Sequence, residues 1–126
     1  MKGVIVSLFI AAAIVAGSAA YTSHTKKVSR ELGEINAGVM ESLEKCDYDG
    51  AAEKIEKLSG YLEEKRMVLS ATGNHEELDK IEINISEMSG YTDGKQQIDA
   101  IAHCKVLDFL FEHLPKNYEL KLGNIL

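Results

Sequence analysis

The sequence GVIVSLFIAAAIVAGSAAY occupies residues 3–21, and the interpretation of the whole chain starts from it. It contains no charged residue and follows a single lysine, Lys2. A helix rises about 1.5 Å per residue, so this run would span roughly 28 Å. That length is close to the roughly 30 Å hydrocarbon core of a bilayer. The sequence therefore predicts a membrane anchor at residues 1–21 that contacts lipid through residues 3–21.

A cleaved signal peptide is the alternative interpretation of the same segment. Its apolar core typically has about 7 to 15 residues, and the run here is longer, which favours a retained anchor. Small residues nevertheless stand at the alternate positions that cleavage requires, Ser18 and Ala20. Secretion after cleavage near Ala20 therefore remains an open alternative.

The orientation of the span depends on the basic residues that flank it. Lys2 precedes the run, and Lys26, Lys27 and Arg30 follow it. Lysine and arginine favour the cytoplasmic side. With the amino terminus counted beside Lys2, the two ends are nearly balanced, and the count leans slightly against an exported domain. Because residues 1–21 resemble a signal sequence, we expect a single-pass cell-membrane protein whose C-terminal domain is extracytoplasmic.

The charge of the remaining chain limits its partners. All 20 acidic residues lie at or after Glu31, and the segment after residue 21 has 13 basic residues, a formal charge of −7. An acidic surface repels the phosphate backbone of nucleic acids. We therefore expect no nucleic-acid partner. With no tryptophan, three phenylalanines and one proline, the core must be built from aliphatic side chains, which suits helices.

Apolar periodicity predicts an all-α domain over residues 28–126, after a polar bridge at residues 22–27. Three segments show apolar residues every three or four positions, the spacing of a helix with one buried face. These positions are Val28, Leu32, Ile35, Val39, Leu43 and Cys46; then Ala51, Ile55, Leu58, Leu62 and Leu69; then Leu78, Ile81, Ile85 and Met88. We expect Asp49 to cap the second helix.

A fourth helix is predicted over residues 95–114, where apolar residues occur on almost every side. A helix of that kind is usually the buried one, so we expect the others to pack around it. Pro115 should end it, because proline lacks an amide donor and clashes with the preceding turn. The tail after Pro115 is expected to be extended.

One internal similarity links two of these helices. Residues 55–65 and 85–95 are identical at five of eleven positions and share the triplet Ser-Gly-Tyr. Helical repeats show such periods, but no third copy occurs, which favours coincidence. The alternative is mechanical: Gly60 and Gly90 would let two helices approach closely.

The two cysteines form the only candidate covalent link. Cys46 and Cys104 are an even pair, and outside the cytoplasm such a pair can form a disulfide. Free cysteine is also among the most buried residue types, so two unlinked core thiols are the competing interpretation.

No motif indicates catalysis, a cofactor or a metal. His75 begins the sequence His-Glu-Glu-Leu-Asp, which lacks the second histidine of a zinc-binding helix. His103 adjoins Cys104, but neighbouring positions on a helix point about 100° apart. We therefore expect no enzymatic activity, no cofactor, and no catalytic, cofactor-binding or metal-binding residues.

The layout resembles domain-of-unknown-function family 4363, a group of short single-anchor helical proteins of clostridia and their relatives. The residues that carry the resemblance are the apolar span, Asp49-Gly50-Ala51-Ala52, His75-Glu76-Glu77-Leu78-Asp79-Lys80-Ile81 and Asn124-Ile125-Leu126. Members often have an aromatic residue, commonly tryptophan, in the second helix, where this chain has Tyr61. The resemblance implies an envelope protein of unknown activity and supplies no catalytic residue.

These observations together predict a membrane-anchored extracytoplasmic helical protein. We expect a non-catalytic interaction or scaffold module whose partner is another envelope protein. A sensory or small-molecule-binding helical domain is the alternative.

Overall fold

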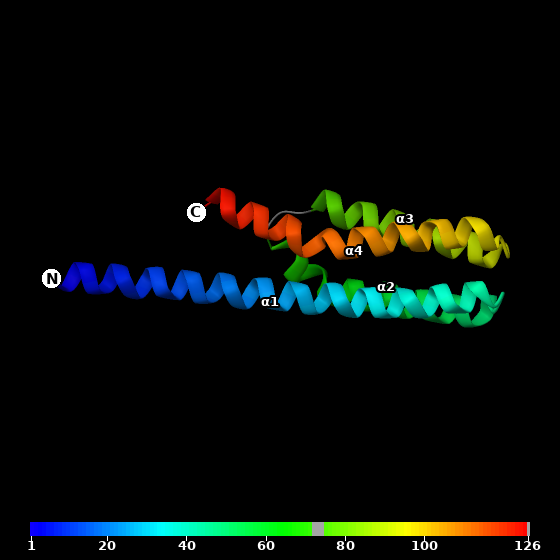
Figure 1. Cartoon of the computed structure of the whole chain (residues 1–126), viewed down its shortest axis with the longest axis horizontal. Coiled ribbons are helices and arrows are strands. Elements are labelled where there is room, and N and C mark those ends of the chain that lie inside the picture. Colours follow the sequence, from blue (N-terminus) through cyan, green and yellow to red (C-terminus); the bar gives the residue numbers. More distant parts are fainter. Residues whose placement is uncertain (72–74, 126) are drawn as a thin grey trace.

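The computed structural model describes residues 1–71 and 75–125, with side chains described as far as Leu114. All regular structure in this part is helical: α1 (Lys2–Glu44), α2 (Tyr48–Ser70), α3 (His75–Asp93) and α4 (Gln97–Ile125). Successive helices run in opposite directions, and α4 returns to pack beside α1, which closes a four-helix bundle (Figure 1). The predicted fold, an apolar N-terminal helix followed by a helical bundle, is confirmed.

The apolar run and the first bundle helix are one continuous helix, α1. Residues 22–27, the expected polar bridge, are helical, and Thr25 is fully buried among the other helices. Its hydroxyl donates to the carbonyl of Tyr21, 2.9 Å away, which satisfies the buried oxygen inside the helix. Polar residues therefore continue the helix here without a break.

The N-terminal half of α1 projects beyond the bundle (Figure 1). Its large apolar side chains are exposed, as Val4 at 65% and Phe9 at 73% illustrate. This helix is long and apolar enough to cross a membrane, a property that a membrane anchor shares with a signal sequence.

The core is one apolar cluster between the four helices. The expected stripes on α1, α2 and α3 are buried, apart from Ile35, which is partly buried, and Cys46, which is exposed. The buried core residues are Val28, Leu32, Val39, Leu43, Ala51, Ile55, Leu58, Leu62, Leu69, Leu78, Ile81, Ile85, Met88, Ala100, Cys104, Leu107, Phe111 and Leu114.

The expectation that α4 is buried on all sides is wrong. Phe111 is 1% exposed, whereas Ile98 and Phe109 are 83% and 59% exposed. In a four-helix ring each helix is covered by two neighbours only, here α1 and α3. Among the described residues, no helix covers the apolar side chains on the outer face of α4.

The expected cap of the second helix is also wrong by two residues. The carboxylate of Asp47, not that of Asp49, accepts from the backbone N–H of Gly50 at 3.0 Å, so α2 begins at Tyr48. The turn before it is made by Cys46, whose φ is 55°. That left-handed residue ends α1, and its N–H bonds to the carbonyl of Leu43 at 3.0 Å.

Pro115 does not end α4, which continues as a helix to Ile125 in place of the extended tail that we expected. Proline has no N–H, so the carbonyl four residues earlier, that of Phe111, loses its intrahelical donor. The hydroxyl of Ser29 on α1 donates to this carbonyl. A neighbouring helix thus supplies the hydrogen bond that the proline removes, and the helix persists.

Candidate functional site

Three hydrogen bonds at seven-residue intervals join α1 to α4. They run from Ser29 Oγ to Phe111 O, from Asn36 Nδ2 to Cys104 O at 2.9 Å, and from Gln97 Nε2 to Leu43 O at 2.9 Å. On each helix the contacting residues are seven positions apart, and residues at that spacing lie on the same face of a packed helix. The contacts therefore fix the axial register of α1 against α4.

The middle contact belongs to a buried polar cluster. Asn36 is fully buried and also donates to Asp108 Oδ1 at 2.7 Å. The thiol of Cys104 donates back to Asn36 Oδ1 at 3.2 Å. Burial, with the nearby carboxylate of Asp108, raises the pKa of Cys104 to about 12. The thiolate is the reactive form of cysteine, so this thiol has the character of an inert core group.

The candidate disulfide between Cys46 and Cys104 is not formed. Both thiols are free; Cys46 is exposed in the α1–α2 turn, and Cys104 is buried beside Asn36. Asn36 lies eight residues before Glu44, the last residue of α1 before the turn that holds Cys46, which is roughly 12 Å along the helix axis. A disulfide requires Cα atoms within about 7 Å.

His103 joins α4 to α3 and does not pair with its neighbour Cys104. Its Nε2 lies 3.2 Å from Glu87 Oε2, and its Nδ1 lies 3.0 Å from Asn84 Oδ1. The ring stacks on Tyr91 with centroids 5.3 Å apart. These contacts occupy both ring nitrogens, which gives His103 a structural role between two helices.

The described residues contain no group of three histidine, cysteine or carboxylate side chains that could hold a metal ion. His75 stands at the exposed first residue of α3.

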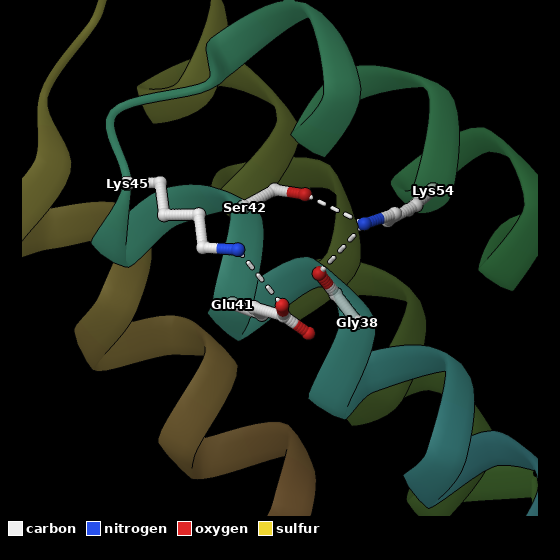
Figure 2. Close-up of polar contacts among 5 residues, drawn as sticks. All are labelled: Gly38, Glu41, Ser42, Lys45 and Lys54. Atoms are coloured by element: carbon white, nitrogen blue, oxygen red, sulfur yellow. Dashed lines mark hydrogen bonds and ion pairs between the residues drawn. The ribbon is translucent and has the colours of Figure 1, made fainter.

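Polar contacts also fasten α1 to α2 near the α1–α2 turn, as Figure 2 shows. The ammonium of Lys54 lies 2.8 Å from Ser42 Oγ and 3.4 Å from the carbonyl of Gly38. Lys45 pairs with Glu41 on the surface of α1 at 3.0 Å. The stem of Lys54 passes over Gly38, where an added Cβ would lie 3.5 Å from its Cδ, an ordinary van der Waals contact.

A groove of about 600 Å³ lies between α2 and α3. It has an apolar floor, small side chains along its length and an acidic rim. The residues that line it are Ala52, Ile55, Glu56, Ser59, Leu62, Glu63, Glu82, Ile85, Ser86 and Ser89. Small side chains keep the two helices from filling the space between them, and this explains the hollow.

Arg66 partly neutralises the acidic rim at one end of this groove. Its guanidinium pairs with Glu82 on α3, and its Nε lies 3.3 Å from Glu63 Oε2. The described side chains that line the groove are three glutamates and seven uncharged residues. The groove is therefore mixed in character, with four apolar residues and three serines in its lining and three glutamates that make its edge acidic.

The structure gives a different explanation for the sequence similarity between residues 55–65 and 85–95. Its serines, Ser59 and Ser89, both line the α2–α3 groove. A Cβ placed on Gly60 or Gly90 would meet no atom within 4 Å, so the mechanical alternative, a close approach of helices at these glycines, is wrong. The repeated small polar residue beside the core stripe was the sequence signal for the groove, and sequence reasoning missed it.

A second hollow, of about 540 Å³, lies where the apolar run of α1 meets the bundle. It is lined by Ala20, Ser23, His24, Lys26, Lys27 and Arg30. We call the three cations Lys26, Lys27 and Arg30 the basic collar. All three side chains are exposed, because the opposite face of α1 carries the buried residues Thr25, Val28 and Ser29.

One carboxylate borders the basic collar. The hydroxyl of Tyr61 on α2 donates to Glu31, and this hydrogen bond is the main reason why the pKa of Glu31 lies below its ordinary value. The charges of Lys27, Lys65 and Arg30 lower it further. Burial, together with the Glu31 carboxylate, raises the pKa of Tyr61. Glu31 is therefore a stable anion held toward α2.

This architecture defines a class: an up-and-down four-helix bundle whose first helix extends beyond the bundle as an apolar rod. The chain belongs to the domain-of-unknown-function family DUF4363, whose model matches residues 19–125. The matched region begins at the last residues of the apolar run and covers the bundle. The resemblance identified from the sequence is thereby confirmed. Comparison with curated proteins and with solved structures found no match.

Proposed function

We propose that the chain is a membrane-anchored, non-catalytic interaction module on the extracytoplasmic side of the cell membrane. Residues 3–21 would hold it in the bilayer, and the α2–α3 groove would receive a helix of another envelope protein. The observation that carries this proposal is the groove itself: an open groove with apolar residues at its floor and an acidic rim, on a bundle whose first helix has an exposed apolar half.

The shape and charge of the groove support a helical partner. An amphipathic helix binds by laying its apolar face into a hydrophobic groove. The buried side chains of Ile55, Leu62 and Ile85 would form the floor beneath it. The carboxylate of Glu56 would meet a basic residue at its edge, because complementary charge favours encounter and register.

Site-specific crosslinking in intact cells tests this proposal. A photoreactive residue replaces Ser59 in the groove, and the control places it at Ala102 on the outer face of α4; both positions are exposed. We expect one adduct of defined mass from the Ser59 position and a much weaker one from Ala102. Recovery of the chain alone at both positions would contradict the proposal.

Charge reversal provides a second, matched control. Glu56→Lys changes the groove rim, whereas Glu53→Lys makes the same change on α2 outside the groove. The adduct should be lost with Glu56→Lys and retained with Glu53→Lys. Equal effects of the two substitutions would show that only net charge matters.

The volume of the same groove favours a second candidate function, small-molecule binding. Ligand pockets typically have volumes of about 300 to 1,000 Å³, and this groove has about 600 Å³. A thermal-shift screen against metabolites tests it, since a ligand that binds only the folded state raises the melting temperature by mass action. Ser59→Leu should abolish any such shift by filling the groove.

A further inference from the structure

We propose that His103, Glu87 and Asn84 form a pH-sensitive clasp between α3 and α4, complete only while the His103 ring carries a proton on both nitrogens. We call these three residues the α3–α4 clasp. In its protonated form the clasp holds α3 against α4, and the loss of one proton loosens this contact. The clasp goes beyond the proposed function, because it depends neither on the membrane anchor nor on a partner.

The first step of the argument is that both ring nitrogens of His103 face oxygen atoms. Nε2 lies 3.2 Å from Glu87 Oε2, and Nδ1 lies 3.0 Å from Asn84 Oδ1. An ionised carboxylate and an amide oxygen only accept hydrogen bonds, whereas a neutral imidazole has one N–H donor and one bare acceptor nitrogen. The imidazolium has two N–H donors, so it is the form of the ring that bonds to both oxygens.

The second step is the orientation of the Asn84 amide. Its Nδ2 donates to the carbonyl of Lys80, one turn earlier on α3, at 2.8 Å. Turning the amide over would place Oδ1 against that carbonyl, so that two acceptors faced each other and the donated hydrogen bond was lost. The contact with Lys80 therefore keeps Oδ1 directed at His103.

The third step is the effect of removing one proton from the ring. If Nδ1 keeps its proton, the bare Nε2 faces the Glu87 carboxylate. If Nε2 keeps its proton, the bare Nδ1 faces Asn84 Oδ1. Either neutral form loses one of the two hydrogen bonds between the helices, and the attraction between imidazolium and carboxylate disappears with the charge. Deprotonation therefore weakens the contact between α3 and α4.

The fourth step is the set of titratable groups around the ring. Glu87 and Tyr91 face it from α3, where Tyr91 stacks on it with ring centroids 5.3 Å apart, and Asp99 stands one turn earlier on α4. Ordinary carboxyl groups lose their protons below about pH 5 and tyrosine above about pH 9, whereas histidine changes its charge between about pH 5 and 8. The His103 side chain is 21% exposed, so water has access to exchange its proton. His103 is therefore the group in this set that responds to pH in that range.

Urea unfolding of the full chain in a non-ionic detergent, at about pH 5.5 and about pH 8.0, tests the proposal. The stability that the clasp contributes is complete in acid and is lost as the pH rises. Since one hydrogen bond changes the unfolding equilibrium constant by a factor of roughly 2 to 12, we expect this constant to rise with pH at least about threefold more in the natural chain than in His103→Gln. Equal pH dependence in the two chains would overturn the proposal.

His75→Gln is the matched control, because His75 is exposed at the first residue of α3 and lies outside the clasp. This variant should keep the pH dependence of the natural chain. A loss as large as that in His103→Gln would overturn the proposal, because the effect would then not belong to the clasp.

Glu87→Gln tests the requirement for two acceptors with a conservative change at an exposed position. A carboxamide donates as well as accepts, so it pairs with Nε2 whether or not that nitrogen carries a proton. The pH dependence should therefore shrink toward that of His103→Gln. Full pH dependence in Glu87→Gln would overturn the proposal.

Nuclear magnetic resonance of the histidine rings gives a readout that a histidine without these hydrogen bonds would not show. Exposed imidazolium N–H protons exchange rapidly with water, whereas hydrogen-bonded ones exchange slowly enough to be observed. At about pH 5.5 we expect two ring N–H signals from His103 and none from His75, with the His103 signals assigned by their absence in His103→Gln. A missing His103 signal at that pH would overturn the proposal. Equal helical content by circular dichroism confirms that each variant is folded.

Discussion

The hydrogen bond from Ser29 to the carbonyl of Phe111 makes a prediction that links two distant positions. Both residues are buried, with exposures of 8% and 1%. Pro115 cannot donate to the carbonyl of Phe111. In Ser29→Ala this carbonyl therefore loses the hydroxyl that donates to it, and it stays buried away from water. An unsatisfied buried polar group costs about 1 to 3 kcal/mol. We expect the free energy of unfolding to fall by that amount.

Pro115→Ala tests the explanation, because it restores an N–H at position 115 that can donate to Phe111. In that background Ser29→Ala should cost about 0.5 kcal/mol or less, since the carbonyl keeps a donor. The two substitutions should therefore show an interaction energy of about 1 to 2 kcal/mol, within the range for residues that share a hydrogen-bond network.

Urea unfolding of the full chain in a non-ionic detergent, followed by far-ultraviolet circular dichroism, measures all four variants. The slope of the unfolding free energy with urea must stay constant for the comparison to hold. Ser42→Ala is the control: it removes a buried hydroxyl from the same helix, and its partner is Lys54. If Ser29→Ala costs the same with and without Pro115, the proline does not create the need for the hydroxyl.

Further predictions use the same unfolding assay. Phe111→Ala should lower the free energy of unfolding by about 3 to 5 kcal/mol, because this side chain is buried. Phe109→Ala should lower it by less than about 1 kcal/mol, because Phe109 is 59% exposed. Similar costs would contradict the one-sided packing of α4. Asn36→Ala should cost about 2 kcal/mol, since it deletes two donated hydrogen bonds. Asp47→Ala should cost about 1 kcal/mol by removing the cap of α2; a neutral effect would show that the cap is dispensable. The pKa of Cys104 is raised from 9.0 to about 12. Above pH 9 the unfolded chain therefore loses this proton before the folded chain does, and stability should fall as the pH rises toward 12, less steeply in Cys104→Ala.

The packing of α1, α2 and α3 could be predicted from sequence because each carries one apolar stripe. Residues such as Leu32, Leu58 and Ile81 stand at helical spacing among polar neighbours, so their burial follows from periodicity alone. In α4 apolar residues occur on several sides, and periodicity cannot say which of Phe109 and Phe111 faces the core. That choice depends on which helices lie beside α4.

The persistence of α4 beyond Pro115 could not be predicted from local rules either. The donor that replaces the missing N–H comes from Ser29, 82 residues away in sequence. The groove was harder still to predict from the sequence, because its serines belong to no recognisable motif. Ser59 and Ser89 matter by leaving space, and the sequence shows only that two helices share a small polar residue beside the core.

The continuous helix α1 has a mechanical consequence. It is 43 residues long, roughly 65 Å, and no flexible joint separates its apolar half from the half that packs in the bundle. With the apolar half embedded, a rotation of the span about its axis turns the whole bundle through the same angle. Inserting a single residue near Ala19 would advance the helical phase by about 100° and turn the groove through that angle relative to the apolar half of α1.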